Sequence, residues 1–167
     1  MRHGFKPNDV VVHPNHGIGS VGKTVEMEVN GETHRFLVVD FRRTALTLRI
    51  PERTLEQSGL RSISSKETMQ AALAVLSAPR AMLPGHWSRW ANIYVAKLNS
   101  GKPELLAEVL RDLSPIGGSW KARLYDEALN RLAEELALVE RVEIAEAQRM
   151  IETQLPTEAP KQTSAAP

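Results

Sequence analysis

The spacing of apolar residues changes near residue 63, and this change divides the chain into two halves. Before it, apolar residues come in short runs such as Val10-Val11-Val12, or alternate with polar ones as in Leu46, Leu48 and Ile50. Runs of this kind, separated by turn-forming residues, are typical of β-strands. Asn30-Gly31 lies between two of them and predicts a tight hairpin turn. The first half therefore predicts a small antiparallel barrel of the SH3-like kind.

After residue 63 the apolar residues recur at helical spacing, which predicts about five helices. Ser64 followed by Glu67 matches a capping box and predicts the start of the first helix. Pro103 is placed to open the third helix, and Ser119 to cap the fourth. We expect an α+β protein with a barrel at 1–63, a compact all-helical domain at 64–155 and a disordered tail at 156–167, which is too poor in apolar residues to pack.

Two polar stretches are expected to face solvent. The segment from Glu56 to Ser65 contains Gly59 and few apolar residues, so it predicts a hinge between the halves. Glu134, Glu135 and Glu140 lie opposite the leucines of the fourth helix, which is typical of a solvated face. We therefore expect each half to fold when it is expressed alone.

The composition excludes several classes of protein. The 167 residues include no cysteine, which excludes disulfides, thiolate metal sites and thiol nucleophiles. No run of about 18 apolar residues is present, and the first residues lack the apolar core of a signal peptide. We expect a cytoplasmic protein that does not contact the membrane.

Basic residues are concentrated next to a pair of tryptophans. The net charge is only +1, but residues 64–103 carry five basic residues against one acidic residue. This segment contains His86-Trp87-Ser88-Arg89-Trp90, and an aromatic ring beside an arginine at a helix start suits nucleic acid. The alternative is a core stripe, because Trp87, Trp90, Ala91, Tyr94, Val95 and Leu98 recur at helical spacing. The basic residues are also scattered enough to form an ordinary solvated face.

The strand that ends at Pro51 is a candidate interaction edge. Alternation from Leu46 to Ile50 directs Arg49 outward, and Pro51 ends the hydrogen-bond ladder. Another chain could extend such an edge, although an ordinary edge blunted by a proline has the same pattern.

A metalloenzyme is a further alternative. His13 and His16 have the spacing of a metal pair, with His3 and His34 available. A Pro-Asn turn separates the first two, and no carboxylate lies close to them in sequence. We therefore predict no metal, no cofactor and no enzymatic activity.

A series of short motifs runs through both halves in a fixed order. In the first half they are Phe5-Lys6, Asp9-Val10-Val11-Val12-His13-Pro14, His16-Gly17-Ile18-Gly19, Leu46-Thr47-Leu48-Arg49-Ile50-Pro51 and Gly59-Leu60-Arg61. In the second half they include Trp87-Ser88-Arg89, Leu98-Asn99-Ser100-Gly101 and Glu108-Val109-Leu110-Arg111-Asp112-Leu113. Over about 150 residues the chain resembles the CarD/CdnL family of bacterial RNA polymerase-binding regulators.

The resemblance implies a transcription regulator made of two binding parts. A Tudor-like barrel would bind the β subunit of RNA polymerase, with Met27, Val39, Arg49 and Pro51 contributing to the surface. The helical domain would contact the minor groove of promoter DNA at the upstream fork of the melted bubble through Trp87 and Arg89, and so stabilise the open complex. We expect Lys97, in the same basic segment, to add a DNA contact. We also expect a monomer that is associated with the nucleoid through the polymerase.

Two residues depart from the family pattern. Trp90 stands where the family usually has a second basic residue, and Lys102 replaces the usual acidic cap of the next helix. A polymerase-binding interaction module with little or no productive DNA binding therefore remains an alternative to the two-part regulator.

Overall fold

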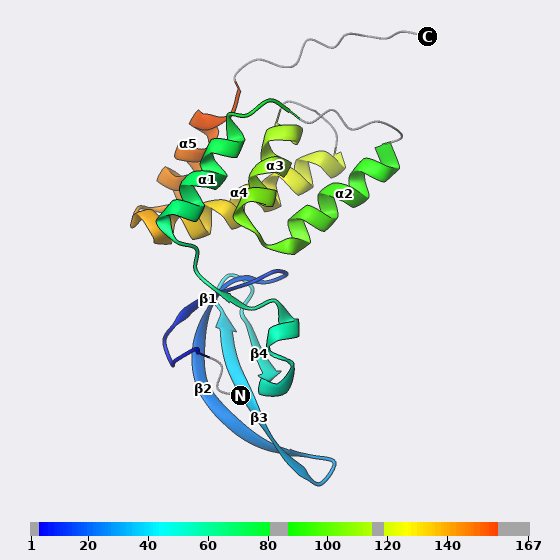
Figure 1. Ribbon diagram of the computed structural model, residues 1–167, viewed down its shortest axis with the longest axis vertical. Coiled ribbons are helices and arrows are strands. Elements are labelled where there is room, and N and C mark those ends of the chain that lie inside the picture. The colour runs from blue at the N-terminus through cyan, green and yellow to red at the C-terminus, as the bar shows by residue number, and fades with distance from the viewer. Residues whose placement is uncertain (1–3, 81–86, 115–118, 157–167) are drawn as a thin grey trace.

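The computed structural model describes residues 4–80, 87–114 and 119–156. Within these ranges a sheet comes first in the chain and five helices follow it (Figure 1). The strands are β1 (Val10–His13), β2 (Gly17–Val29), β3 (Glu32–Phe41), β4 (Leu46–Pro51) and β5 (Arg61–Ser62). The helices are α1 (Lys66–Leu76), α2 (Trp87–Ser100), α3 (Pro103–Leu113), α4 (Ser119–Glu140) and α5 (Ile144–Gln154). The predicted α+β class and the order of its parts are confirmed. The tail at 157–167 lies outside the described residues.

The strands, together called the β domain here, form one antiparallel sheet in the order β4-β3-β2-β1-β5. In the described residues this order leaves β4 and β5 at its two ends, and the ladders alone do not close it into a barrel. The β2–β3 hairpin turns at Asn30-Gly31, where both residues have positive φ (54° and 80°) and Val29 pairs with Glu32. Asparagine and glycine tolerate this left-handed conformation best, so the predicted tight turn is confirmed. The core behind the sheet consists of Val11, Val21, Leu37, Val39, Phe41, Ile50 and Leu55.

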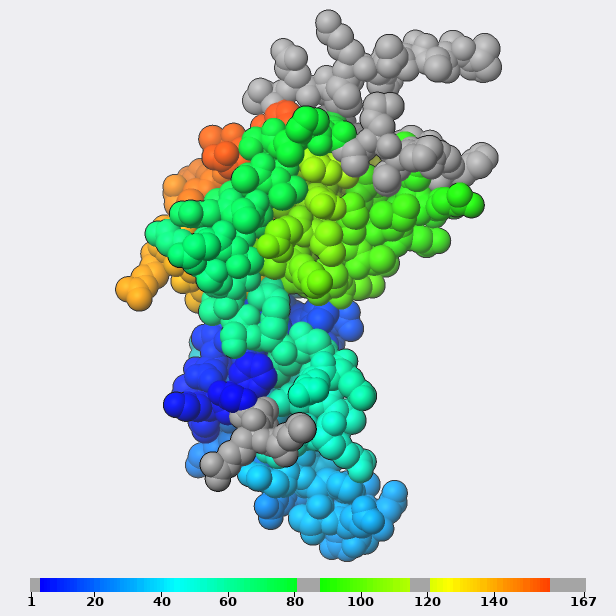
Figure 2. Space-filling view, viewed as in Figure 1, coloured from blue at the N-terminus to red at the C-terminus, as the bar shows by residue number. Residues whose placement is uncertain are grey.

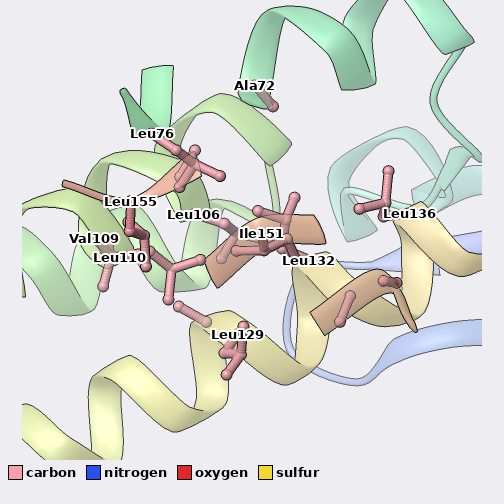
Figure 3. Close-up of a cluster of buried hydrophobic side chains, with 14 of the residues drawn as sticks. Ala72, Leu76, Leu106, Val109, Leu110, Leu129, Leu132, Leu136, Ile151 and Leu155 are labelled. Atoms are coloured by element: carbon pink, nitrogen blue, oxygen red, sulfur yellow. The ribbon is translucent and has the colours of Figure 1, made fainter. Parts of the chain in front are cut away.

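The helices, together called the helical domain, pack around α3. Leu106, Val109 and Leu110 of α3 are buried among residues of α1, α4 and α5 (Figure 3). Pro103 occupies the first turn of α3, as predicted, because a helix start needs no proline N–H. In the part of the chain that the structure describes, no helix is both long and apolar enough to cross a membrane.

Two sequence predictions need correction within this domain. The residue that caps α1 is Ser65, whose side chain accepts from the Thr68 N–H at 3.1 Å, and not Ser64. The Ser64 hydroxyl instead accepts from Arg61 at 3.2 Å, and the Ser64 N–H donates to Glu135 at 2.8 Å. Val95 is exposed rather than part of the core stripe, whereas Tyr94 and Leu98 are buried. The side chain of Ser119 lies outside the described residues, although α4 begins there.

Candidate polymerase and DNA interfaces

The register of the sheet places Met27, Arg49 and Pro51 on one face. Met27 pairs with His34, Val38 pairs with Arg49, and Phe36 pairs with Pro51. Paired residues project on the same side of a sheet, and every second residue of a strand shares that side. We call this side the outer face; it comprises Met27, His34, Phe36, Val38, Arg49 and Pro51.

The opposite face of the sheet is the core face. Val39 pairs with Leu48 on this side and is 0% exposed, whereas Met27 on the outer face is 40% exposed. Val39 therefore supports the sheet from behind and does not reach its surface. Phe36 and Val38 are half-buried on the outer face, and sequence reasoning missed them. Four consecutive apolar residues from 36 to 39 contain no alternation that would separate the two faces.

The edge strand β4 carries the alternation that the sequence predicted. Thr47 and Arg49 are exposed, Ile50 is buried, and Leu46 and Leu48 are partly buried against the core. Since β4 is the end strand of the sheet, its outer side has no ladder partner in the described residues. Arg49 thus lies on the outer face, at an open edge of the sheet.

The first turn of α2 contains residues in two different environments, one exposed to solvent and one packed against the core. Arg89 is exposed, and Trp90 is half-buried against the helical core, as its position in the apolar stripe predicts. Trp87 is the first residue of α2, and its side chain lies outside the described part of the chain. Lys97, near the other end of α2, has its ammonium 2.6 Å from Glu108 and 5.6 Å from the centre of the Tyr94 ring.

A buried polar network lies beneath α2. The Tyr94 hydroxyl donates to Asp112 at 3.2 Å, and Arg111 Nε donates to the other carboxylate oxygen at 2.7 Å. Burial, followed by the Asp112 charge, raises the pKa of the Tyr94 phenol, so this hydroxyl stays a donor. The two terminal nitrogens of Arg80 are also buried near this carboxylate, and they have no hydrogen-bond partner among the residues that the structure describes. The network joins α2 to α3 at a point two turns from Trp87.

Charged side chains join the two domains. Arg61 of β5 donates to both carboxylate oxygens of Glu135 at 2.7 and 2.9 Å, and to the Gly101 carbonyl at 2.7 Å. Arg131 of α4 donates to the carbonyls of Pro14 and Leu98. We call these contacts, with Arg43 bound to Glu127 and Glu134, the junction. Figure 2 shows that the molecule narrows between the β domain and the helical domain.

The junction corrects two sequence predictions. Glu135 is 1% exposed, and Glu134 and Glu140 are partly buried, so these acids are not a solvated face. The segment from Glu56 to Ser65 was expected to be a hinge with little packing, but its Arg61 is fixed to α4. Gly101, at φ +66°, brings the end of α2 close to the turn after β1, because a Cβ there would lie 2.9 Å from Pro14 Cα.

The histidines do not converge on a common point. The rings of His13 and His16 lie 4.7 Å apart beside Phe41, but the Nδ1 of His13 accepts the Asn15 N–H at 3.1 Å. His34 lies on the hairpin, 3.7 Å from Glu32, and His3 is outside the described residues. Within those residues, no group of three or more metal-binding side chains is found.

Comparison with protein families matches both domains. Residues 5–64 match the family described as the CarD-like/TRCF RID domain, and residues 71–152 match the CarD C-terminal domain. The first of these is an RNA polymerase-interacting domain, which implies that the β domain binds RNA polymerase. CarD-family proteins are transcription factors without enzymatic activity. Since the two matches cover the sheet and the helices in this order, the chain belongs to the CarD family.

Proposed function

We propose that the outer face and the β4 edge bind the β subunit of RNA polymerase, and that the start of α2 contacts promoter DNA at the upstream edge of the bubble. Simultaneous binding of both stabilises the open promoter complex. The observation that carries the polymerase part is the strand register, since it gathers Met27, Arg49 and Pro51 on one side of the sheet. Val39 contributes to this surface only through packing, because it is buried.

The DNA contact is proposed for Trp87 and Arg89. Arg89 is exposed at the start of α2 and can meet a phosphate, with an affinity that falls as salt rises. The adjacent aromatic ring of Trp87 would wedge into the minor groove. Lys97 is a secondary contact, because its ammonium must leave Glu108 before it can bind a phosphate.

The polymerase contact is tested by reversing the charge of Arg49. Arg49→Glu leaves the core face untouched, and we expect the protein to fold normally while its affinity for the β subunit falls at least tenfold, as opposed charges across an interface allow. Lys23→Glu, which reverses another exposed charge of the β domain, is the matched control. Wild-type affinity in Arg49→Glu would show that another surface binds the polymerase.

The DNA contact is tested by comparing the two tryptophans of α2. Stacking or wedging on a base is worth about 1–3 kcal/mol, so Trp87→Ala should shorten the open-complex lifetime while the melting temperature barely changes. Trp90→Ala should lower the melting temperature first, since Trp90 packs against the core. If wild-type protein binds the polymerase but neither binds fork DNA nor prolongs the open complex, the interaction module without productive DNA binding is the correct function.

A further inference from the structure

Two charged side chains one turn apart on α4 reach different parts of the β domain. Residues four apart lie on the same face of a helix, and Arg131 and Glu135 both contact the β domain from this face of α4. Arg131 binds the turn after β1 through the Pro14 carbonyl. Glu135 binds the segment around β5, where it accepts from Arg61 and from the Ser64 N–H. These two side chains of α4 therefore hold the β domain at two separate points.

The contacts of Glu135 are both buried and directional. Its carboxylate is almost fully buried and receives three N–H groups, two of them from one guanidinium in a bidentate pair. Arg61 also donates to the Gly101 carbonyl, so its plane is fixed from both sides. A rotation of one domain against the other would break the bidentate pair with Arg61, whose geometry is directional. An intact buried ion pair adds little net stability, whereas removing one of its partners is strongly destabilising.

We propose that Glu135 is a positioning residue that, together with Arg131, fixes the orientation of the helical domain relative to the β domain. The distance between the outer face of the sheet and the start of α2 is thereby constant. For its biological purpose this inference rests on the proposed function, in which the two surfaces bind the polymerase and the DNA at the same time.

A distance measurement between the domains tests the proposal directly. The chain has no cysteine, so Thr33→Cys on the hairpin and Ala145→Cys on α5, both exposed positions, can carry the only two spin labels. Double electron–electron resonance on the full chain should give one narrow distance distribution. Glu135→Gln should broaden it. Glu140→Gln is the matched control, since it removes a carboxylate from the same helix whose partner, Lys66, belongs to the helical domain.

A second variant keeps the test valid if Glu135→Gln folds poorly. Replacing a buried ion pair by apolar residues is often neutral for stability, so the double variant Arg61→Met, Glu135→Met should fold and still show a broad distribution. Its affinity for the β subunit should equal that of wild type, while the open-complex lifetime should fall several-fold. An unchanged narrow distribution in the double variant would overturn the proposal. A broad distribution with an unchanged lifetime would support the positioning role of Glu135 and overturn the purpose given to the fixed orientation.

The proposed function and the positioning role of Glu135 are tested by different measurements. If wild-type protein does not prolong the open complex, the proposed function is wrong. The distance distributions still decide whether Glu135 sets the orientation, because they are measured without polymerase or DNA.

Discussion

The interior of the helical domain and the junction both hold parts of the molecule together, but with opposite kinds of side chain. The interior consists of leucines, alanines and a few larger apolar residues around α3. The junction consists of arginines, glutamates and backbone carbonyls. Apolar packing is strong and tolerates rotation, whereas hydrogen bonds to a buried charge accept one geometry. The apolar cores therefore supply the stability of the fold, and the junction sets the orientation of one domain relative to the other.

The largest expected effect comes from the interior. Leu132→Ala removes a fully buried side chain of α4 and should cost about 2–5 kcal/mol of unfolding free energy. All three tryptophans belong to the helical half, so tryptophan fluorescence during urea unfolding follows this half alone. Leu138→Ala, at a position of the same helix that is 45% exposed, should change the unfolding free energy by less than about 0.5 kcal/mol. Equal losses of unfolding free energy in both variants would contradict the burial of Leu132 in this interior.

A smaller effect is expected when the junction is cut altogether. The two apolar cores share no residue, so fragments 1–63 and 64–156 should each fold alone, with lower melting temperatures than in the full chain. In the separated fragments, water hydrates Arg61 and Glu135. Circular dichroism and amide proton dispersion measure the outcome, and an unfolded 1–63 fragment would show that the β domain depends on α4.

A pH effect is expected at the turn that Arg131 binds. Burial, then His16, then Arg131 lower the pKa of His13, whose Nδ1 must stay unprotonated to accept the Asn15 N–H. The unfolded chain then binds more protons than the folded one, so stability is full above the ordinary pKa of 6.5 and falls as the pH drops below it.

Urea unfolding between pH 5 and pH 8 measures this dependence. Glu134 faces the same turn, and burial raises its pKa, so the His13 contribution must be isolated by substitution. His13→Gln retains an acceptor that does not titrate and should flatten the dependence near pH 6.5. His34→Gln, on the hairpin, should leave it as in wild type.

The smallest effect is expected from an exposed ion pair. Arg149 and Glu146 of α5 approach to 2.8 Å, but their side chains are 71% and 50% exposed. Arg149→Ala should change the unfolding free energy by about 0–0.5 kcal/mol, because water screens such pairs. A large loss of unfolding free energy in Arg149→Ala would show that exposed ion pairs stabilise this fold as strongly as the charged pairs of the junction.

The sequence predicted the local structure better than the contacts between domains. The Asn30-Gly31 turn and the Pro103 helix start depend on the backbone preferences of those residues, so they could be predicted locally. The role of Glu135 could not, because helical periodicity separates the apolar face of α4 from its polar side but does not reveal that the β domain covers that polar side. The error of one residue at the α1 cap has the same cause, since the Ser64 hydroxyl accepts from Arg61 of the β domain.

At the candidate polymerase interface, too, local alternation could be predicted from the sequence, but the effect of pairing between strands could not. Alternation from Leu46 to Ile50 correctly directed Arg49 outward. The run from Phe36 to Val39 has no alternation, and only the pairing with β4 shows that Val38 faces outward and Val39 inward.

The bond between Arg61 and Glu135 also affects the order in which parts of this chain can fold. The two residues are 74 positions apart, and at about 5–20 residues per second a ribosome needs about 4–15 s to add that length. The β domain emerges first and can form its own core during this interval, before Arg61 can reach Glu135. This bond can therefore set the relative orientation of the domains only after the residues of α4 have left the ribosome.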